Sequence, residues 1–342
     1  MFCRKRSSNL CARMIASKRG ATGLSGIIAV DKPAGLTSHD IVNRIRRITR
    51  ERRVGHCGTL DPFATGLLMV CIGPATRLAD YLMGARKRYV ARISFGVLTD
   101  TDDCEGAVVE VCPLDGELFD KLSSFEFAQG FLAGLVGRHE QIPPSYSAIQ
   151  RDGVRSYDAA RRGDILTLKA RPIEVYAAEL LGILAQGDET PLQADATLGL
   201  TWDVAFEVSK GTYIRALARD IAGQLGTCGH LAALRRTSSG QIGLADAYTL
   251  EAIEARGVEA CFLDPVCALG LPTYVLDAQQ RADVLNGRPL TPDPQVFSSA
   301  KRDGSIVACI CDDAFFALYR YDEGQGNLRA LAVIPGAVRL LK

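Results

Sequence analysis

Apolar residues recur along this chain with two different periods, which predicts a fold that mixes strands and helices. An apolar run at residues 26–30 is typical of a buried strand. Thr37 or Ser38 can cap the helix that follows, which should extend to about residue 50. The apolar stripe of that helix consists of Ile41, Ile45 and Ile48, and its opposite face is rich in arginine.

In the middle of the chain, at residues 88–225, the apolar pattern predicts both strands and a helix. Alternation at residues 88–97 indicates a strand, with Tyr89 near its start and on the same face as Ile93. Residues 194–208 alternate in the same way, and residues 211–225 have the period of an amphipathic helix.

After residue 271 the pattern changes to short strand-like runs separated by turns that contain glycine and proline. Such a pattern predicts a small β-rich domain. Cys309 and Cys311 should share one face of the first run. The runs are residues 305–311, 315–321 and 328–334.

A basic segment at residues 137–171 interrupts the regular pattern. It contains seven arginine or lysine residues together with Tyr146 and Tyr157, and Pro143-Pro144 divides it. Basic side chains interleaved with aromatic ones suit phosphate contact and base stacking. A solvated helical hairpin explains the same composition, so the segment alone leaves both interpretations open.

The overall composition is that of an ordinary globular protein, with 47% hydrophobic and 23% charged residues. No apolar run reaches the ~18 to 20 residues that span a bilayer, so no membrane association is expected. The net charge is only +1, so a nucleic acid would have to be held by local basic patches such as residues 44–53. Residues 1–24 are basic and are interpreted as a flexible extension, although a transit peptide or a start at Met14 fits as well.

Several cofactor and metal sites are not expected. The eleven cysteines form no C-x-x-C pair, and their odd number and scattered spacing favour reduced thiols in a cytosolic protein. No nucleotide-binding glycine motif occurs. The acidic segment from Asp100 to Glu105 fails the spacing of a calcium loop, so we interpret it as a polar turn that ends the Tyr89 strand.

The most specific candidate chemistry lies at residues 53–68, where Asp61 stands between glycines and a proline. Gly58 lets the backbone approach a ligand closely, and Pro62 fixes the chain directly after the acid. A carboxylate held in this way is a candidate nucleophile or base. A turn in which Asp61 caps its own backbone is the alternative, and the loop alone does not decide between them.

Four sequence blocks resemble the motifs of the TruB family of pseudouridine synthases. The block GHCGTLDPFATGLL at residues 55–68 is similar to the GHxGTLDPxATGxL loop of the family. The block DKPAGLTS at residues 31–38 is similar to its DKPxGxTS opening. The blocks KRY at residues 87–89 and SKGTYIR at residues 209–215 follow in the family order, so a chance match is implausible.

The resemblance implies an α+β fold with a mixed, mainly antiparallel sheet of the pseudouridine synthase type. It implies a catalytic domain at residues 25–268, in which residues 137–171 form an inserted thumb arm that grips RNA. Residues 269–342 resemble, less specifically, a PUA-like RNA-binding domain.

The family also implies three catalytic residues. Asp61 would act as a nucleophile at C1′ of the target uridine or as the base that removes its C2′ proton. Tyr89 would stack on the uracil and take part in removing the C5 proton. Arg215 would pair with Asp61 and keep it ionised, although a surface helix arginine is the plain alternative.

Further residues are predicted to bind the substrate. His56, Tyr213 and Leu234 would surround the flipped base, while Lys32 would meet phosphate or support the loop. Without the resemblance, a capping histidine and an ordinary core leucine are the favoured interpretations of His56 and Leu234. The loop residues Gly58, Thr59 and Leu60 complete the predicted set.

The resulting hypothesis is a cofactor-free, metal-free enzyme that isomerises a T-loop uridine of tRNA, as a cytoplasmic monomer without an obligate protein partner. The alternatives are a guide-RNA-dependent relative acting on rRNA, a catalytically silent RNA-binding or RNA-folding protein, and a glycoside hydrolase. A silent scaffold should lack Asp61 or Arg215, and a glycoside hydrolase needs a second carboxylate.

Overall fold

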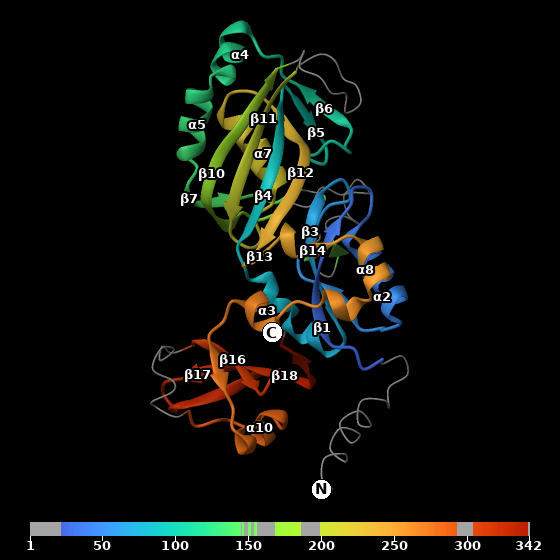
Figure 1. The fold of residues 1–342 in the computed structure, drawn as a ribbon. Coiled ribbons are helices and arrows are strands. Elements are labelled where there is room, and N and C mark those ends of the chain that lie inside the picture. The colour runs from blue at the N-terminus through green and yellow to red at the C-terminus, as the bar shows by residue number, and fades with distance from the viewer. Residues whose placement is uncertain are drawn as a thin grey trace. The chain divides into compact units, whose positions relative to one another are not determined.

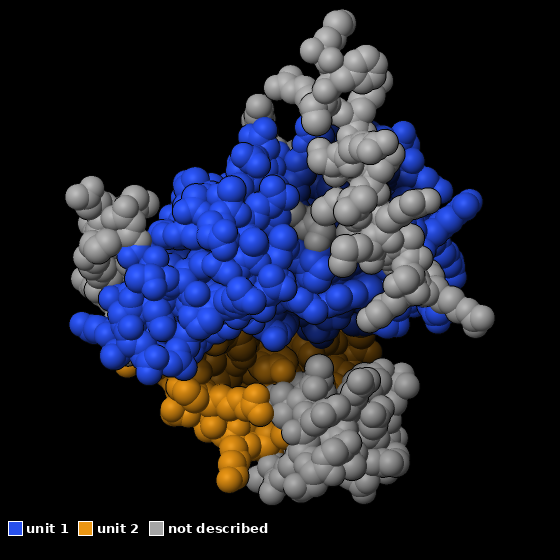
Figure 2. Space-filling view, turned by 90° about the horizontal axis from the view of Figure 1, so that it is seen from below, with its two compact units in different colours: residues 1–85, 238–342 blue, residues 86–237 orange. Residues whose placement is uncertain are grey.

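The computed structural model describes residues 22–144, 146, 150–151, 154–155, 168–185, 199–292 and 304–340. The chain forms two compact units, one from residues 1–85 and 238–342 and the other from residues 86–237 (Figure 2). Nearly all of the predicted basic extension and much of the predicted arm lie outside the described residues.

The first unit is built around strand β1 (Gly26–Lys32), which pairs antiparallel with β3 (Thr65–Ile72). The short strand β14 (Ala247–Tyr248) pairs parallel with β1, and β2 (Val54–His56) pairs antiparallel with β3. The apolar run at residues 26–30 is entirely buried, which confirms the predicted strand.

Helix α2 (Ser38–Thr49) follows β1 and begins at the predicted cap. The Thr37 hydroxyl accepts a hydrogen bond from the Asp40 backbone N–H, and the Asp40 carboxylate accepts one from the Thr37 N–H. This capping box satisfies backbone donors that the first helical turn leaves without partners. Ile48, the third position of the predicted stripe, is only partly buried. The buried residues of the helix are Ser38, Ile41, Val42, Ile45 and Thr49.

Helix α8 (Leu250–Arg256) lies beside α2 (Figure 1). Several short helices and strands complete this part of the first unit. They are η1 (Gly73–Leu78), α3 (Ala79–Met83), β13 (Ile242–Gly243), η2 (Leu244–Asp246), α8 (Leu250–Arg256), η3 (Val258–Cys261) and α9 (Pro265–Leu269).

The second unit contains a long antiparallel sheet, whose strands run side by side in Figure 1. The strand order is β4 (Lys87–Phe95), β11 (Leu200–Val208), β10 (Arg171–Ala185) and β7 (Gly137–Gln141), with β12 (Gly229–Ser239) on the other side of β4. The remaining elements are β5 (Val97–Thr99), β6 (Val108–Val111), α4 (Gly116–Ser123), α5 (Phe125–Ala133), β8 (Gln150–Arg151) and β9 (Val154–Arg155).

Among the described residues of the second unit, the largest fully buried side chain is that of Trp202 in β11, which has no exposed surface. Its indole N–H donates to the Leu122 carbonyl oxygen at 2.8 Å, so the one polar atom of the side chain is satisfied. Its ring meets that of Phe95 edge to face at a centroid distance of 4.9 Å. The contact between Trp202 and Phe95 packs β11 against β4, the strand that carries the buried Tyr89 near its start.

Helix α7 (Ile214–Gln224) begins later than the predicted start at Gly211, so that part of the prediction was wrong. Gly211 adopts a φ of 82°, which belongs to a turn and not to a right-handed helix. Tyr213 is still extended, with φ −95° and ψ 111°. The glycine turn therefore places Tyr213 before the helix and Arg215 in its first turn.

The C-terminal part of the first unit is β-rich, as predicted. Its sheet has the order β15 (Thr273–Val275), β16 (Ile306–Cys311), β17 (Ala314–Asp322) and β18 (Asn327–Arg339), with helix α10 (Ala278–Leu285) beside it. Cys309 and Cys311 are buried in the same apolar cluster, which confirms their shared face. Phe315 and Leu318 belong to a second cluster that also contains Leu78 and Leu82, so this sheet and the η1–α3 segment share one core.

The fold class is therefore the predicted α+β type with mainly antiparallel sheets. Across the described segments, no helix has both the length and the apolar character needed to cross a membrane.

Candidate active site

The Asp61 loop connects β2 to β3, and its shape depends on glycine. Gly58 and Gly66 adopt φ values of 101° and 99°, which side chains other than glycine rarely tolerate. Asp61 is half-buried, Leu60 is buried and Thr59 is exposed. Asp61 thus lies, partly exposed, on a loop whose backbone path depends on glycine.

The residues on both sides of Asp61 are anchored by the segment that joins β1 to α2. The Ser38 hydroxyl donates to the Leu60 carbonyl oxygen at 3.0 Å and accepts from the Leu60 N–H at 2.8 Å. The Gly35 N–H donates to the Pro62 carbonyl oxygen at 2.9 Å. These bonds fix the backbone immediately before and after Asp61, which restricts where its carboxylate can lie.

Lys32 adds a third anchor to the same loop. Its side chain has no exposed surface, and its Nζ donates to the carbonyl oxygens of Pro33, Leu36 and Pro62 at 2.9, 2.7 and 3.0 Å. A buried ammonium group needs such partners, because an unpaired buried charge is costly. These three hydrogen bonds are those expected if Lys32 supports the Asp61 loop. Contact with a phosphate group would require the Lys32 side chain to leave this position.

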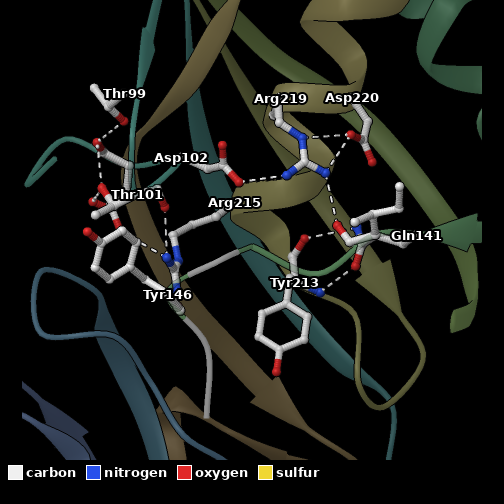
Figure 3. A network of polar contacts seen from close by, with 11 residues as sticks. Thr99, Thr101, Asp102, Gln141, Tyr146, Tyr213, Arg215, Arg219 and Asp220 are labelled. Carbon is white, nitrogen blue, oxygen red and sulfur yellow. Dashed lines mark hydrogen bonds and ion pairs between the residues drawn. The ribbon is translucent and has the colours of Figure 1, made fainter. Parts of the chain in front are cut away.

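In the second unit, Arg215 is a buried residue and not a surface arginine. Its guanidinium group donates to the Thr101 carbonyl oxygen at 2.8 Å and to the Tyr146 carbonyl oxygen at 2.9 Å (Figure 3). It also lies 3.5 Å from a carboxylate oxygen of Asp103. The predicted pairing of Arg215 with Asp61 stays a prediction.

Asp103 is a residue that the sequence interpretation missed, because the acidic segment was assigned only a polar turn. The turn is present, but it follows the short strand β5 and not the Tyr89 strand β4, which ends at Phe95. Its hydrogen bonds orient the acid: Asp103 Oδ1 accepts from the Thr101 hydroxyl at 2.6 Å and from the Glu105 N–H at 3.0 Å. The other oxygen, Oδ2, faces Arg215. Adjacent acids at 102 and 103 were the available signal, but their basic partners are more than a hundred residues away.

Asp102 belongs to the same turn and adopts a left-handed φ of 61°. One of its carboxylate oxygens lies 2.8 Å from Arg219 Nη1. Burial raises the pKa of the Asp102 carboxyl group, and the charges of Arg219 and Arg215 offset that shift only in part.

Tyr89, Leu234 and Tyr213 also lie in the second unit. Tyr89 and Leu234 are buried, and the Arg236 guanidinium group lies 5.9 Å from the centre of the Tyr89 ring. The Tyr213 backbone is held on both sides by Gln141: its N–H donates to Oε1 at 2.9 Å, and its carbonyl oxygen accepts from Nε2 at 3.1 Å (Figure 3).

The predicted site residues thus fall into two groups. His56, which is half-buried at the end of β2, belongs with the Asp61 loop and Lys32 in the first unit. Tyr89, Tyr213, Arg215 and Leu234 belong to the second. Among the residues that the structure describes, no cluster of three or more side chains suited to a metal ion occurs.

Comparison with protein families identifies the chain. A model of the TruB family pseudouridylate synthase N-terminal domain matches residues 46–214, and one of the tRNA pseudouridylate synthase B C-terminal domain matches residues 215–265. The tRNA pseudouridine synthase B of Mycobacteroides abscessus is 40% identical over 311 residues, which cover 91% of this chain and 97% of that protein. The protein of the same name from Mycobacterium leprae is 39% identical and covers 96% of each chain. The chain therefore belongs to the TruB family of pseudouridylate synthases.

Solved structures show the same fold. A chain in the crystal structure of a Cbf5-Nop10-Gar1 complex matches with a TM-score of 0.61 at 24% identity, over 90% of this chain and 84% of that one. A chain of the archaeal box H/ACA sRNP Nop10-Cbf5 complex matches with a TM-score of 0.59 at 24% identity, over 90% and 86%. At this level of identity the likeness bears on the fold alone.

Proposed function

We propose that this protein isomerises a specific uridine in the T-loop of tRNA to pseudouridine. The observation that carries the proposal is the anchoring of the backbone on both sides of Asp61 by Ser38, Gly35 and Lys32. The names of the 40%-identical relatives support tRNA as the substrate. The protein would act in the cytoplasm as a monomer, with no obligate protein partner.

The reaction breaks the bond between N1 of uracil and C1′, turns the base and joins C5 to C1′. The proton on C5 is lost and N1 gains one, so the change is an isomerisation that needs no redox partner. Asp61 attacks C1′ or removes the C2′ proton, and the three backbone anchors keep it aligned with the sugar.

The other predicted residues act on the detached base. Arg215, buried and oriented by Asp103, is proposed to pair with Asp61 through opposite charge. Tyr89 stacks on the uracil and takes part in removing the C5 proton. His56, Tyr213 and Leu234 line the space for the flipped base, whose extrusion from the RNA stack costs a few kcal/mol.

The direct test is Asp61→Asn, which keeps the size of the side chain but removes its charge and its ability to accept a proton. Pseudouridine formation on T-arm RNA should be abolished, while the dissociation constant for the same RNA stays within a few-fold of wild type. The measurement is chemical mapping of pseudouridine without added cofactor, together with a binding titration.

Wild-type protein that binds T-arm RNA but forms no pseudouridine would instead identify a catalytically silent RNA-binding protein. Substantial turnover by Asp61→Asn would remove Asp61 from the chemistry. Urea unfolding of Asp61→Asn alongside wild type is the control for general damage to the loop.

A further inference from the structure

Two arginines one turn apart on α7 each contact two other segments of the second unit. Arg215 and Arg219 each contact the acidic turn on one side and the chain that follows β7 on the other (Figure 3). Arg215 belongs to the predicted catalytic set. Arg219 has no role assigned by the motifs.

Arg219 makes three kinds of polar contact. Its Nη1 lies 2.8 Å from Asp102 Oδ2, and its Nη2 donates to the Ile142 carbonyl oxygen at 2.9 Å. Its Nε and Nη2 also donate to Asp220 Oδ1 at 3.0 and 2.9 Å. Because the guanidinium group is planar and rigid, the Asp102 and Asp220 carboxylates fix the direction in which it presents Nη2 to Ile142.

The chain after β7 is held at neighbouring points as well. Gln141 forms its two hydrogen bonds with the Tyr213 backbone, and the Tyr146 carbonyl oxygen accepts from Arg215. Residues 141, 142 and 146 are therefore all fixed to the first turns of α7 or to the residue before it. These residues lie in the first part of the basic segment at residues 137–171, before six of its seven basic residues.

We propose that Arg219, oriented by Asp102, is a positioning residue that fixes the start of this basic segment and thereby sets the affinity for RNA. The inference rests on the proposed function, in which the basic segment contacts the T-arm. If its start is already fixed, less conformational freedom is lost when RNA binds, and the affinity is higher. The chemical step depends on other residues and should not change.

The test is Arg219→Ala, measured by steady-state kinetics on T-arm RNA. KM should rise about tenfold, as expected for the loss of one charge-assisted hydrogen bond, while kcat stays within about twofold. The same change made in the Asp61→Asn background should raise the dissociation constant by a similar factor, which measures affinity without turnover. Arg219→Lys keeps the charge but not the planar, forked guanidinium group. Its KM should lie between the values of wild type and Arg219→Ala.

Arg92→Ala is a matched control. Arg92 forms a bidentate ion pair with Asp203, both distances being 2.8 Å, and its side chain is about as exposed as that of Arg219, at 33% against 27%. It lies in β4 on the face opposite to Tyr89, and its ion-pair partner belongs to β11 and not to the chain after β7. It should leave KM unchanged, and urea unfolding of both variants measures any general loss of stability.

An equal rise in KM for Arg92→Ala and Arg219→Ala would overturn the proposal, because the effect would then be general. A fall in kcat with unchanged KM for Arg219→Ala would also overturn it, since the residue would act on the chemical step. Failure of the proposed function has a different signature, namely that wild-type protein forms no pseudouridine.

Discussion

At the scale of single residues, the buried charges of Lys32 and Asp103 are held by hydrogen bonds to groups close by in the sequence or in the Asp61 loop. Lys32 donates to three carbonyl oxygens, and Asp103 accepts from a hydroxyl and a backbone N–H before it meets Arg215. Each of these groups would be costly to bury alone. The motif residue Lys32 is thus explained by the path of the Asp61 loop.

Lys32→Met tests this explanation, because methionine fills the same space but cannot donate. The free energy of unfolding should fall by about 3 kcal/mol, since three carbonyl oxygens lose a charged donor inside the protein. Turnover should fall as well, because Asp61 loses one of its anchors. Urea unfolding and single-turnover kinetics measure the two effects.

Arg47→Met is the comparison, since Arg47 is an exposed residue of α2. It should leave stability unchanged and reduce only the salt dependence of RNA binding. If Lys32→Met behaved in the same way, Lys32 would be a phosphate contact and not a support for the loop.

Some of these residues could be predicted from the sequence and others could not, because some depend on local backbone geometry and others on contacts between distant residues. The need for glycine at position 58 could be inferred from the local motif, because φ is a local property. The partnership of Asp103 with Arg215 could not, since it depends on the fold bringing together residues far apart in the chain. The same holds for Asp102 and Arg219.

At the scale of elements, α2 and the loop after it present a strongly basic surface. Residues 44–53 contain a single acid, Glu51, which is buried, and one of its carboxylate oxygens accepts from the Thr22 N–H and hydroxyl at 2.8 and 3.0 Å. Burial pushes the Glu51 pKa upward, but hydrogen bonds from Thr22, Arg53 and Arg52 outweigh it, so the pKa is below its ordinary value. The exposed arginines are Arg44, Arg47, Arg50, Arg52 and Arg53.

Element boundaries were predictable where the signal was local. The cap predicted at Thr37 or Ser38 placed the start of α2 correctly, and Thr37 is the cap in the structure. The start of α7 was misplaced because periodicity continues through a glycine turn whose φ of 82° the apolar pattern does not reveal.

The basic segment after β7 gives the prediction at this scale. Simultaneous replacement of four of its arginines by alanine should weaken T-arm binding strongly. It should also reduce the slope of affinity against salt, by about 0.7 to 0.9 for each phosphate that the variant no longer neutralises. The measurement is a binding titration at several salt concentrations. The four residues are Arg151, Arg155, Arg161 and Arg162, of which the last two lie outside the described residues.

A fourfold variant of α2 and its loop, with Arg44, Arg47, Arg50 and Arg52 changed to alanine, alters the net charge equally and serves as the comparison. If only this second variant lost affinity and slope, the basic segment would be a solvated hairpin, and α2 would carry the RNA-binding surface.

At the scale of the whole molecule, packing between segments that are distant in the sequence determines which elements share a hydrophobic core. Leu78 and Leu82 share a core with Phe315 and Leu318, so the β-rich C-terminal sheet packs with the η1–α3 segment. Periodicity indicates that each of these segments has an apolar face, but not which faces meet. The predicted boundary at residue 269 therefore stays a prediction.

The net charge of +1 makes the distribution of charge more important than its total. Residues 1–21 carry six basic residues and no acid, and the chain enters the described structure at Thr22, beside the arginines that follow α2. This stretch can add attraction for phosphates without being part of the active site. The six residues are Arg4, Lys5, Arg6, Arg13, Lys18 and Arg19.

Deletion of residues 2–21 should therefore lower the affinity for tRNA by about threefold at low salt and by less at high salt, because the interaction is between exposed charges. The deletion keeps Thr22, so its two hydrogen bonds to Glu51 remain and the free energy of unfolding should not change. The turnover number should equal that of the full chain, since Asp61 and its anchors are untouched. Binding titrations at two salt concentrations, urea unfolding and single-turnover kinetics on the same preparation test the three expectations together. A large fall in the turnover number with unchanged stability would mean that the basic extension acts within the active site, and the assignment of its role to phosphate attraction alone would be wrong.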